Sequence, residues 1–389
     1  MKVKNKKLVA LTTAALSLPG MIPKASQAQT IPENFTASYR FTEYKEDDQD
    51  GVVEGSPQRY DISIHQLSLV APVSSQVSFN VDASTESMSG ASPWLVASDA
   101  DEKPVQVMSG ATIEESRDDI SFAANFYQEK ARIGLGISRS TENDYDSTSA
   151  NINTSVWFNG KNTTLDVGFS FSDDTITPTQ KSGITRVTEE DKDSNSLALG
   201  LSQVINKTLL VGAGFSYASY DGFLSDPYKL AEVEGVRVFD SRPDSKDQFS
   251  LDFKLRKYLT KYSAAIHADY KYYDNNWGIS SHTVNVGWYQ NIQMWQFSTS
   301  VRWYDQSSAN FYQNFYTAER ADGYYSSDYR LSAYGALSYR LGLSKSYEFG
   351  TFKITYENYN SGKGTQSDGD LNPGLVDFQF ITLGFDYKF

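Results

Sequence analysis

The most constraining feature of the sequence is an alternation of apolar and polar residues that continues to the last residue of the chain. In the closing segment, Leu383, Phe385, Tyr387 and Phe389 share one parity, and polar or small residues occupy the other. Successive side chains of a β-strand point to opposite faces, so such a segment has one apolar and one polar face. A strand of a membrane barrel meets lipid on one side and a wet lumen on the other. The pattern therefore predicts a strand that closes a membrane barrel.

About sixteen segments of this kind follow one another, and short turns alternate with long loops between them. A β-sandwich gives no reason to segregate loop lengths in this way, and no blade repeat of a propeller is present. We predict an all-β protein, a single closed antiparallel transmembrane β-barrel of about sixteen strands. Its short turns would be periplasmic and its long loops extracellular. Asn159-Gly160 predicts a tight hairpin.

One segment departs from this alternation of apolar and polar residues. Tyr60, Ile62 and Ile64 share one parity, whereas Leu67 and Leu69 lie on the other. A β-bulge near His65 is one explanation, because an extra residue reverses the faces of the strand beyond it.

The N-terminus has the pattern of an export signal. Four lysines precede a mostly apolar stretch over residues 8–22, and the small residues Ser26 and Ala28 follow. These features predict a signal peptide over residues 1–28, an outer-membrane barrel domain over 29–389, and residence in the Gram-negative outer membrane. Removal of residues 1–28 takes away five lysines and no acids, so the net charge changes from −13 to −18. That charge argues against a nucleic-acid partner.

The sequence contains no motif that predicts a cofactor, a metal site or an enzyme. Cysteine is absent, which excludes disulfides, thiolate metal sites and attached c-type haem. The acidic loops do not match EF-hand spacing, although loose bridging of Mg²⁺ or Ca²⁺ to lipopolysaccharide stays open. The three histidines, His65, His267 and His282, belong to no hydrolase motif. We therefore expect no catalytic residue, no cofactor and no bound metal.

Charged residues recur on the parity that would face the lumen. On the lipid face, each Lys or Arg near the membrane midplane costs about 2–4 kcal/mol of stability. Charged residues that all fall on the inward-facing parity therefore support the assignment of the two faces. The set either lines a pore that selects small solutes by charge, or its members neutralise one another inside a plugged barrel. The residues are Arg40, Asp252, Lys254, Arg256, His267, Asp269, Lys271, Arg302, Arg330, Lys353 and Glu357.

The connection over residues 86–116 carries a repeated element. Met-Ser-Gly-Ala begins at Met88 and again at Met108. Two small-residue turns around a Pro-Trp would let this connection pack inside the barrel as a constriction or plug; the alternative is an exposed loop. The residues concerned are Ser89, Gly90, Trp94, Ser109, Gly110 and Arg117.

These paired Ser-Gly-Ala elements, with an Arg shortly after the second, resemble a family of Gram-negative outer-membrane proteins defined only as a domain of unknown function. The closing residues Leu383, Phe385, Tyr387 and Phe389 resemble the signal by which such barrels are recognised for assembly. The resemblance covers most of the mature chain and implies a barrel without an established activity. It also implies a link to envelope redox proteins, but no flavin-attachment motif is present here.

The function that we predict is a porin-like channel for small polar or charged solutes. The alternative is a non-conducting scaffold or docking barrel for an envelope system, which the resemblance suggests is redox-related. The expected partners are outer-membrane lipid and lipopolysaccharide, the barrel-assembly machinery and small solutes. A homo-oligomer stays open.

Overall fold

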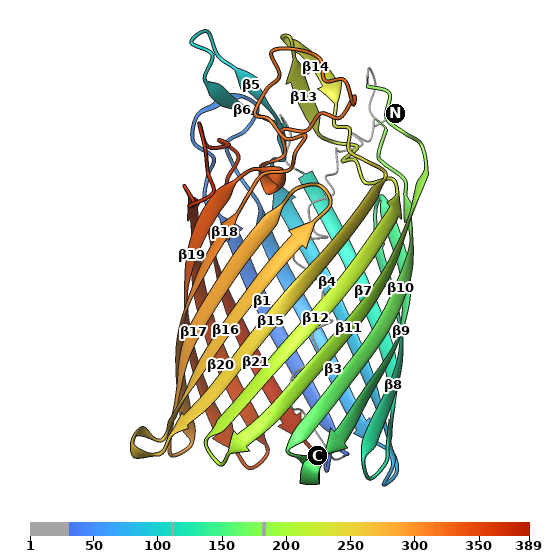
Figure 1. Ribbon diagram of the computed structural model, residues 1–389, viewed down its shortest axis with the longest axis vertical. Coiled ribbons are helices and arrows are strands. Elements are labelled where there is room, and N and C mark those ends of the chain that lie inside the picture. The colour runs from blue at the N-terminus through green and yellow to red at the C-terminus, as the bar shows by residue number, and fades with distance from the viewer. Residues whose placement is uncertain (1–30, 110–112, 181–183) are drawn as a thin grey trace, which may run out of the picture.

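The computed structural model describes residues 31–109, 113–180 and 184–389, and it confirms a closed antiparallel barrel of sixteen strands (Figure 1). The predicted signal peptide lies outside the described residues. Strands that follow one another along the barrel are neighbours in it, and β1 pairs with β21 to close the ring. The barrel strands are β1 (Thr36–Glu46), β3 (Asp61–Pro72), β4 (Val77–Gly90), β7 (Ile113–Tyr127), β8 (Ala131–Glu142), β9 (Tyr145–Phe158), β10 (Thr163–Ile176), β11 (Glu190–Asn206), β12 (Leu209–Gly222), β15 (Ser245–Leu259), β16 (Ala264–Asn275), β17 (Ser280–Ile292), β18 (Trp295–Gln306), β19 (Tyr334–Tyr347), β20 (Gly350–Gly362) and β21 (Phe378–Lys388).

The ends of the chain meet where the ring closes. The register runs from Thr36 opposite Lys388 to Glu46 opposite Phe378. Beyond it, the amide of Phe389 donates to the carbonyl of Phe35 over 3.0 Å, and their rings meet edge to face. The predicted assembly-signal residues therefore lie on the outer face of the closing strand, where Phe389 is 70% exposed.

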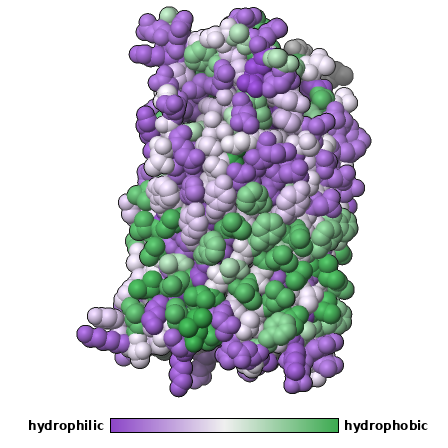
Figure 2. Space-filling view, viewed as in Figure 1, coloured by the Kyte–Doolittle hydropathy of each residue, from purple (hydrophilic) through white to green (hydrophobic). Residues whose placement is uncertain are grey.

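The outer surface carries a hydrophobic band that covers only part of the barrel height. Exposed apolar residues such as Ile120, Phe122, Leu135 and Val286 form it. In Figure 2 the band occupies the half toward the short turns, and the half toward the long loops is hydrophilic. A band of this kind matches the lipid-facing surface of membrane barrels. The strands extend beyond it on the long-loop side.

The connections segregate by length, as the sequence predicts. One end carries only short turns: 73–76, 128–130, 159–162, 207–208, 260–263, 293–294 and 348–349. The other end carries 47–60, 91–112, 177–189, 223–244, 307–333 and 363–377, and two short exceptions, 143–144 and 276–279. The predicted hairpin at Asn159-Gly160 is present, and both residues have left-handed φ angles, 49° and 60°. Among the described residues, no helix has the length and apolarity needed to cross a membrane.

Five of the long connections fold together into a structure that we call the cap: the described residues of 47–60, 91–109, 223–244, 307–333 and 363–377. It contains a three-stranded sheet of β2 (Val52–Glu54), β6 (Pro104–Met108) and β5 (Pro93–Ser98), and the hairpin of β13 (Leu230–Val233) and β14 (Val236–Phe239). Strands β5, β6, β13 and β14 lie beyond the ends of the barrel strands in Figure 1. The 3₁₀ turn η3 (Tyr329–Leu331) also belongs to the cap, whereas η1 (Asn159–Lys161) and η2 (Thr260–Tyr262) lie in short turns.

The predicted bulge near His65 is absent. Strand β3 pairs with β1 and β4 in unbroken register from Asp61 onward. The phase changes because Tyr60 and Ile62 point inward, where they pack with Tyr44 and Met88 in a buried cluster at the mouth. An internal apolar cluster therefore replaces the lipid contact that the alternation indicates.

Candidate pore and its loop cap

Two neighbouring strands, β15 and β16, carry a row of charged and titratable side chains on their inward faces. The next residues along these strands, such as Phe253 and Leu255, are exposed on the outer face. The guanidinium of Arg256 lies 2.6 Å from a carboxylate oxygen of Asp269. Six predicted pore residues thus form three adjacent cross-strand pairs: Asp252 with Lys271, Lys254 with Asp269, and Arg256 with His267.

A second charged group lies on the inner wall of β1, β19, β20 and β21. The Asp386 carboxylate accepts from Arg40 and from Lys353, at 2.5 and 2.6 Å. Arg340 donates to Glu357 through its Nε, over 2.5 Å. Arg340 of β19 and Asp386 of β21 were not among the predicted pore residues, although both share the inward parity of that set.

The interior has room for solvent beside these charges. Arg340 and Lys353 point inward, yet their side chains remain 54% and 42% exposed. On the opposite wall, small residues of β11 and β12 such as Gly200 and Gly214 help to leave a cavity of about 350 Å³ next to Lys254. The lumen is therefore a polar space lined by both signs of charge.

Arg302 of β18 also has the inward parity of the predicted pore residues. Its neighbours Val301 and Trp303 are exposed on the outer face. Its guanidinium lies 6.0 Å from the ring centroid of Tyr304, and the part of the chain that the structure describes provides no acidic partner within ion-pair distance. It is thus an uncompensated positive charge in the upper lumen.

Arg330 requires a correction, because the prediction placed it on a membrane-spanning strand. Strand β19 begins only at Tyr334, and Arg330 lies in η3 of the cap. The apolar residues that suggested a strand have another partner: Leu331 is buried against Trp277 and Phe311. Arg330 therefore belongs to the mouth of the barrel and not to its transmembrane wall.

Arg330 is part of a buried ionic cluster at the centre of the cap. Its guanidinium contacts Asp226 at 2.9 Å and holds Asp328 through its Nε at 2.8 Å. Arg242 contacts Asp328 at 2.9 Å and Asp240 at 2.7 Å. The ammonium of Lys229 lies 3.8 Å from Asp328, so three cations balance three carboxylates. The cluster members are Asp226, Lys229, Asp240, Arg242, Asp328 and Arg330.

Burial and pairing act in opposite directions on the pKa values of this cluster. Burial alone would raise the pKa of Asp328, but Arg330, Lys229 and Arg242 outweigh it and hold that pKa well below its ordinary value. Burial lowers the pKa of Lys229 and raises that of Asp240. The cluster depends on complete pairing, because a buried charge without its partner is costly.

The cap also binds the inner wall where β1 and β3 end. Arg59 donates through its Nε to Glu46 over 2.7 Å, and Tyr44 donates to the same carboxylate over 3.0 Å. The Arg59 guanidinium lies 5.7 Å from the ring centroid of Tyr329, so two loops of the cap, 47–60 and 307–333, meet beside this wall.

Loop 307–333 crosses the mouth of the barrel. Tyr329 contacts the β1–β3 side through Arg59, whereas Leu331 and Phe311 pack on Trp277 in the β16–β17 connection. In the ring of sixteen strands, β3 and β16 lie on nearly opposite sides. The loop thus forms a roof over the lumen.

The connection over 86–116 contributes to this roof. Residues 86–90 complete β4, and the residues from 113 begin β7, so its described middle part forms the β5–β6 hairpin of the cap. The Ser92 amide donates to the Ser109 hydroxyl over 2.9 Å, and the Ser109 amide donates to the Ser92 carbonyl over 2.8 Å. This connection therefore lies at the mouth, and a plug deep within the barrel is not what its described residues form.

The other residues singled out in this connection have separate surroundings. Gly90 has a φ of 141°, and a Cβ there would lie 2.4 Å from the carbonyl oxygen of Arg59. Trp94, in β5, packs against a buried cluster of the cap. Arg117, in β7, donates to Ser140 over 2.8 Å. Gly110 lies outside the described residues.

The histidines do not form a catalytic arrangement with serine. Tyr39 and Tyr270 contact the Nδ1 atoms of His65 and His282 at 2.7 and 2.8 Å. His267 faces the lumen, where its ring lies 4.2 Å from that of Tyr289. Within the described residues, no serine hydroxyl lies within hydrogen-bond distance of a histidine nitrogen. Absence of enzymatic activity stays a prediction.

The closed ring, the outer hydrophobic band and the segregated loops define an outer-membrane type of β-barrel. The chain belongs to the family described as "Protein of unknown function (DUF3570)", whose model matches residues 8–378. The resemblance to a family without established function is thereby confirmed.

One solved structure supports the same fold at low sequence identity, and a second gives a lower TM-score. CdiB from Acinetobacter baumannii is similar with a TM-score of 0.53 and 8% identity, over 92% of this chain and 60% of that one. OccD3 (OpdP) from Pseudomonas aeruginosa matches with a TM-score of 0.45 and 11% identity, over 93% and 94% of the two chains. No curated protein matches the chain.

Proposed function

We propose that the protein is an outer-membrane channel for small polar or charged solutes, and that its extracellular mouth is closed at rest by the cap. The observation that supports a channel most directly is the exposure of inward-facing charges, since Arg340 remains 54% exposed within the barrel. A barrel that served only as a scaffold would have no need for a hydrated, charged interior.

The cap adds a condition to transport. Loops 223–244 and 307–333 meet over the lumen through the buried ionic cluster, so a solute passes only when these loops separate. We therefore expect a low resting conductance with rare openings. The lumen wall carries both signs of charge, and Arg302 adds an uncompensated positive charge below the roof.

A non-conducting docking barrel is the second candidate, and the outermost part of the cap favours it. The β13–β14 hairpin exposes Val236 to 63% beside its tip and Phe239 to 45% at its base, and Val53 of β2 is 62% exposed. Exposed apolar side chains at the end of a loop structure fit a protein contact. The partner chemistry would then be an apolar surface and not a dissolved solute.

Conductance of the purified protein in a planar bilayer separates the two candidates. We expect brief openings for the natural protein and more frequent ones for Asp328→Asn, which removes a carboxylate from the centre of the ionic cluster. Asp322→Asn is the matched control, because Asp322 lies in the same loop in an exposed pair with Arg320.

Trypsin susceptibility of the cap, measured on the same samples, shows whether it has opened. An insulating barrel whose cap is demonstrably open would contradict the channel and favour the docking barrel. We further propose that the protein resides in the outer membrane, contacts lipopolysaccharide above the hydrophobic band, and has no enzymatic activity.

A further inference from the structure

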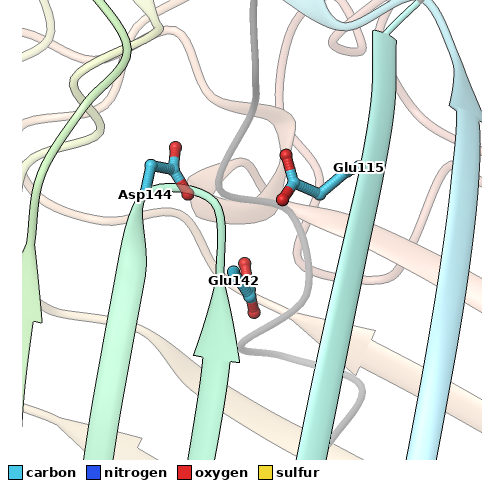
Figure 3. Close-up of side chains that lie close together, drawn as sticks. All are labelled: Glu115, Glu142 and Asp144. Carbon is cyan, nitrogen blue, oxygen red and sulfur yellow. The ribbon is translucent and has the colours of Figure 1, made fainter.

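Three carboxylates converge at the long-loop rim of the barrel, away from the ionic cluster of the cap. Glu115 lies in the first part of β7, Glu142 ends β8, and Asp144 lies in the connection to β9. Their ligand oxygens all lie within 4.8 Å of one another (Figure 3). They lie five residues or more beyond Ile120 and Ile137 of the hydrophobic band, so the site is outside the lipid-facing zone.

Two oxygens of this group are buried and have no hydrogen-bond partner among the residues that the structure describes. Glu115 is 5% exposed and Asp144 only 1%, yet Oε2 of Glu115 and Oδ1 of Asp144 are unsatisfied. Their other oxygens are occupied: the Asn143 amide donates to Glu115 over 3.1 Å, and the Tyr228 hydroxyl donates to Asp144. A buried carboxylate oxygen without a partner is costly unless something positive lies beside it.

The described residues provide little positive charge for the three carboxylates. The Arg117 guanidinium lies 3.8 Å from Glu142, and neither Glu115 nor Asp144 forms an ion pair within the described part of the chain. Three negative charges therefore face one positive charge, and the two unsatisfied oxygens belong to the two carboxylates without a cation.

We propose that Glu115, Glu142 and Asp144 bind a divalent cation with the chemistry of Ca²⁺. Calcium takes oxygen ligands at about 2.3–2.6 Å, so two oxygens on opposite sides of one ion lie about 4.6–5.2 Å apart. The carboxylate oxygens here fit within that span. Water molecules supply the remaining ligands, because calcium takes about six to eight.

Protons compete with the cation for these groups. Burial raises the pKa of Glu115 to about 7 and that of Asp144 to about 6. Binding therefore weakens as the pH falls below 7, since the carboxylates must be ionised to act as ligands. The charged or titratable groups that face the site are Arg117, Glu142, Tyr145, Asp226 and Tyr228.

The position of the site gives the cation a structural consequence. Tyr228, which donates to Asp144, belongs to loop 223–244 of the cap, and its ring stacks with Arg186 at 4.8 Å. The carbonyl of Asp144 also accepts from the Thr177 amide over 2.8 Å. A bound cation would thus fasten the cap to the barrel rim. Cation binding itself does not depend on whether the barrel conducts.

Calorimetric titration of CaCl₂ into the detergent-solubilised full chain, freed of metal with EDTA, tests the site. We expect saturable binding of one ion at pH 7.5, and a loss of at least tenfold in affinity at pH 5.5. The double variant Glu115→Gln, Asp144→Asn should show no saturable heat. Terbium luminescence gives a second readout, because tyrosine sensitises the lanthanide and Tyr228 contacts the site; excess CaCl₂ should quench it.

The matched control is Asp118→Asn with Asp146→Asn, which removes two exposed carboxylates from the outer face of β7 and β9. It should bind Ca²⁺ like the natural protein. Heat-dependent mobility on a detergent gel shows that each variant retains its barrel. Absence of saturable binding to the natural protein, or equal binding to the folded Glu115→Gln, Asp144→Asn variant, would overturn the proposal; Mg²⁺ that binds more tightly than Ca²⁺ would also overturn it.

Discussion

The substitution Asp328→Asn tests whether the buried ionic cluster holds the cap closed. Asp328 has no exposed side-chain area and contacts three cations: Arg330, Arg242 and Lys229. Asparagine has nearly the same shape but no charge, so the cluster changes from neutral to one net positive charge. Removal of one partner from a buried pair costs about 3–5 kcal/mol, because the remaining charge stays buried.

The structure places the expected effect at the lower end of that range. Arg330 keeps its contact with Asp226 at 2.9 Å, and Arg242 keeps Asp240 at 2.7 Å, so each guanidinium retains one carboxylate. If the closed cap loses about 3 kcal/mol of stability, the population of molecules with an open cap grows roughly a hundredfold, since about 1.4 kcal/mol is a factor of ten in an equilibrium constant. The control Asp322→Asn breaks an exposed pair and should cost about 0–1 kcal/mol.

Trypsin cleavage of the cap, in protein held in detergent, measures this population. When the loops open and close faster than they are cut, the cleavage rate follows the open fraction. We expect cleavage within 223–244 and 307–333 to accelerate about a hundredfold in Asp328→Asn and by less than about fivefold in Asp322→Asn. Equal rates in the two variants would refute the view that the cluster closes the cap.

Three further predictions concern the lumen, the rim and the packing of the cap. Arg302→Glu should move the reversal potential in a salt gradient toward cation selectivity, and an unchanged potential would remove this residue from the conduction path. In EDTA, the protection factors of the amides in the loop around Tyr228, which correct exchange for its intrinsic dependence on pH, should rise as the pH falls from 8 to 5. The raised pKa values of Glu115 and Asp144 mean that the folded cap binds more protons than the open one, so its stability falls as pH rises from about 4, the ordinary carboxyl pKa, to about 7; lower protection at pH 5 than at pH 8 would contradict this sign. Gly90→Ala should destabilise the cap by about 1–3 kcal/mol, because the residue has a φ of 141° and its Cβ would meet a backbone carbonyl, and a denaturant midpoint equal to that of the natural protein would exclude this strain.

The sequence predicts the barrel well because the alternation repeats one physical constraint on every strand. An apolar face must meet lipid, so strand number, closure and loop segregation follow from parity. The same rule fails where an apolar residue has another partner. Tyr60 and Ile62 share an inward cluster at the mouth, and Leu331 is buried under the roof, so parity placed both segments wrongly. The misplacement of Arg330 follows from that of Leu331.

The candidate sites depend on contacts between loops that are distant in the sequence. The ionic cluster joins Asp226 and Arg242 to Asp328 across about a hundred positions, and no local pattern connects them. The carboxylates of the rim are closer in sequence, since Glu142 and Asp144 are two residues apart. However, Glu115 joins them only through the pairing of β7 with β8, and burial of its oxygen appears only in the folded structure.

Fluorescence quenching by brominated lipids tests most directly whether the outer band lies in a membrane beneath a cap outside it. One variant would keep only Trp303, which is 39% exposed on the outer face of β18, and another only Trp277, which lies in the β16–β17 connection and is buried against the cap. In vesicles that contain dibrominated phosphatidylcholine, we predict strong quenching of Trp303 and none of Trp277. Equal emission of Trp303 in brominated and ordinary vesicles would contradict a lipid-facing barrel surface, and with it the placement of lumen and cap.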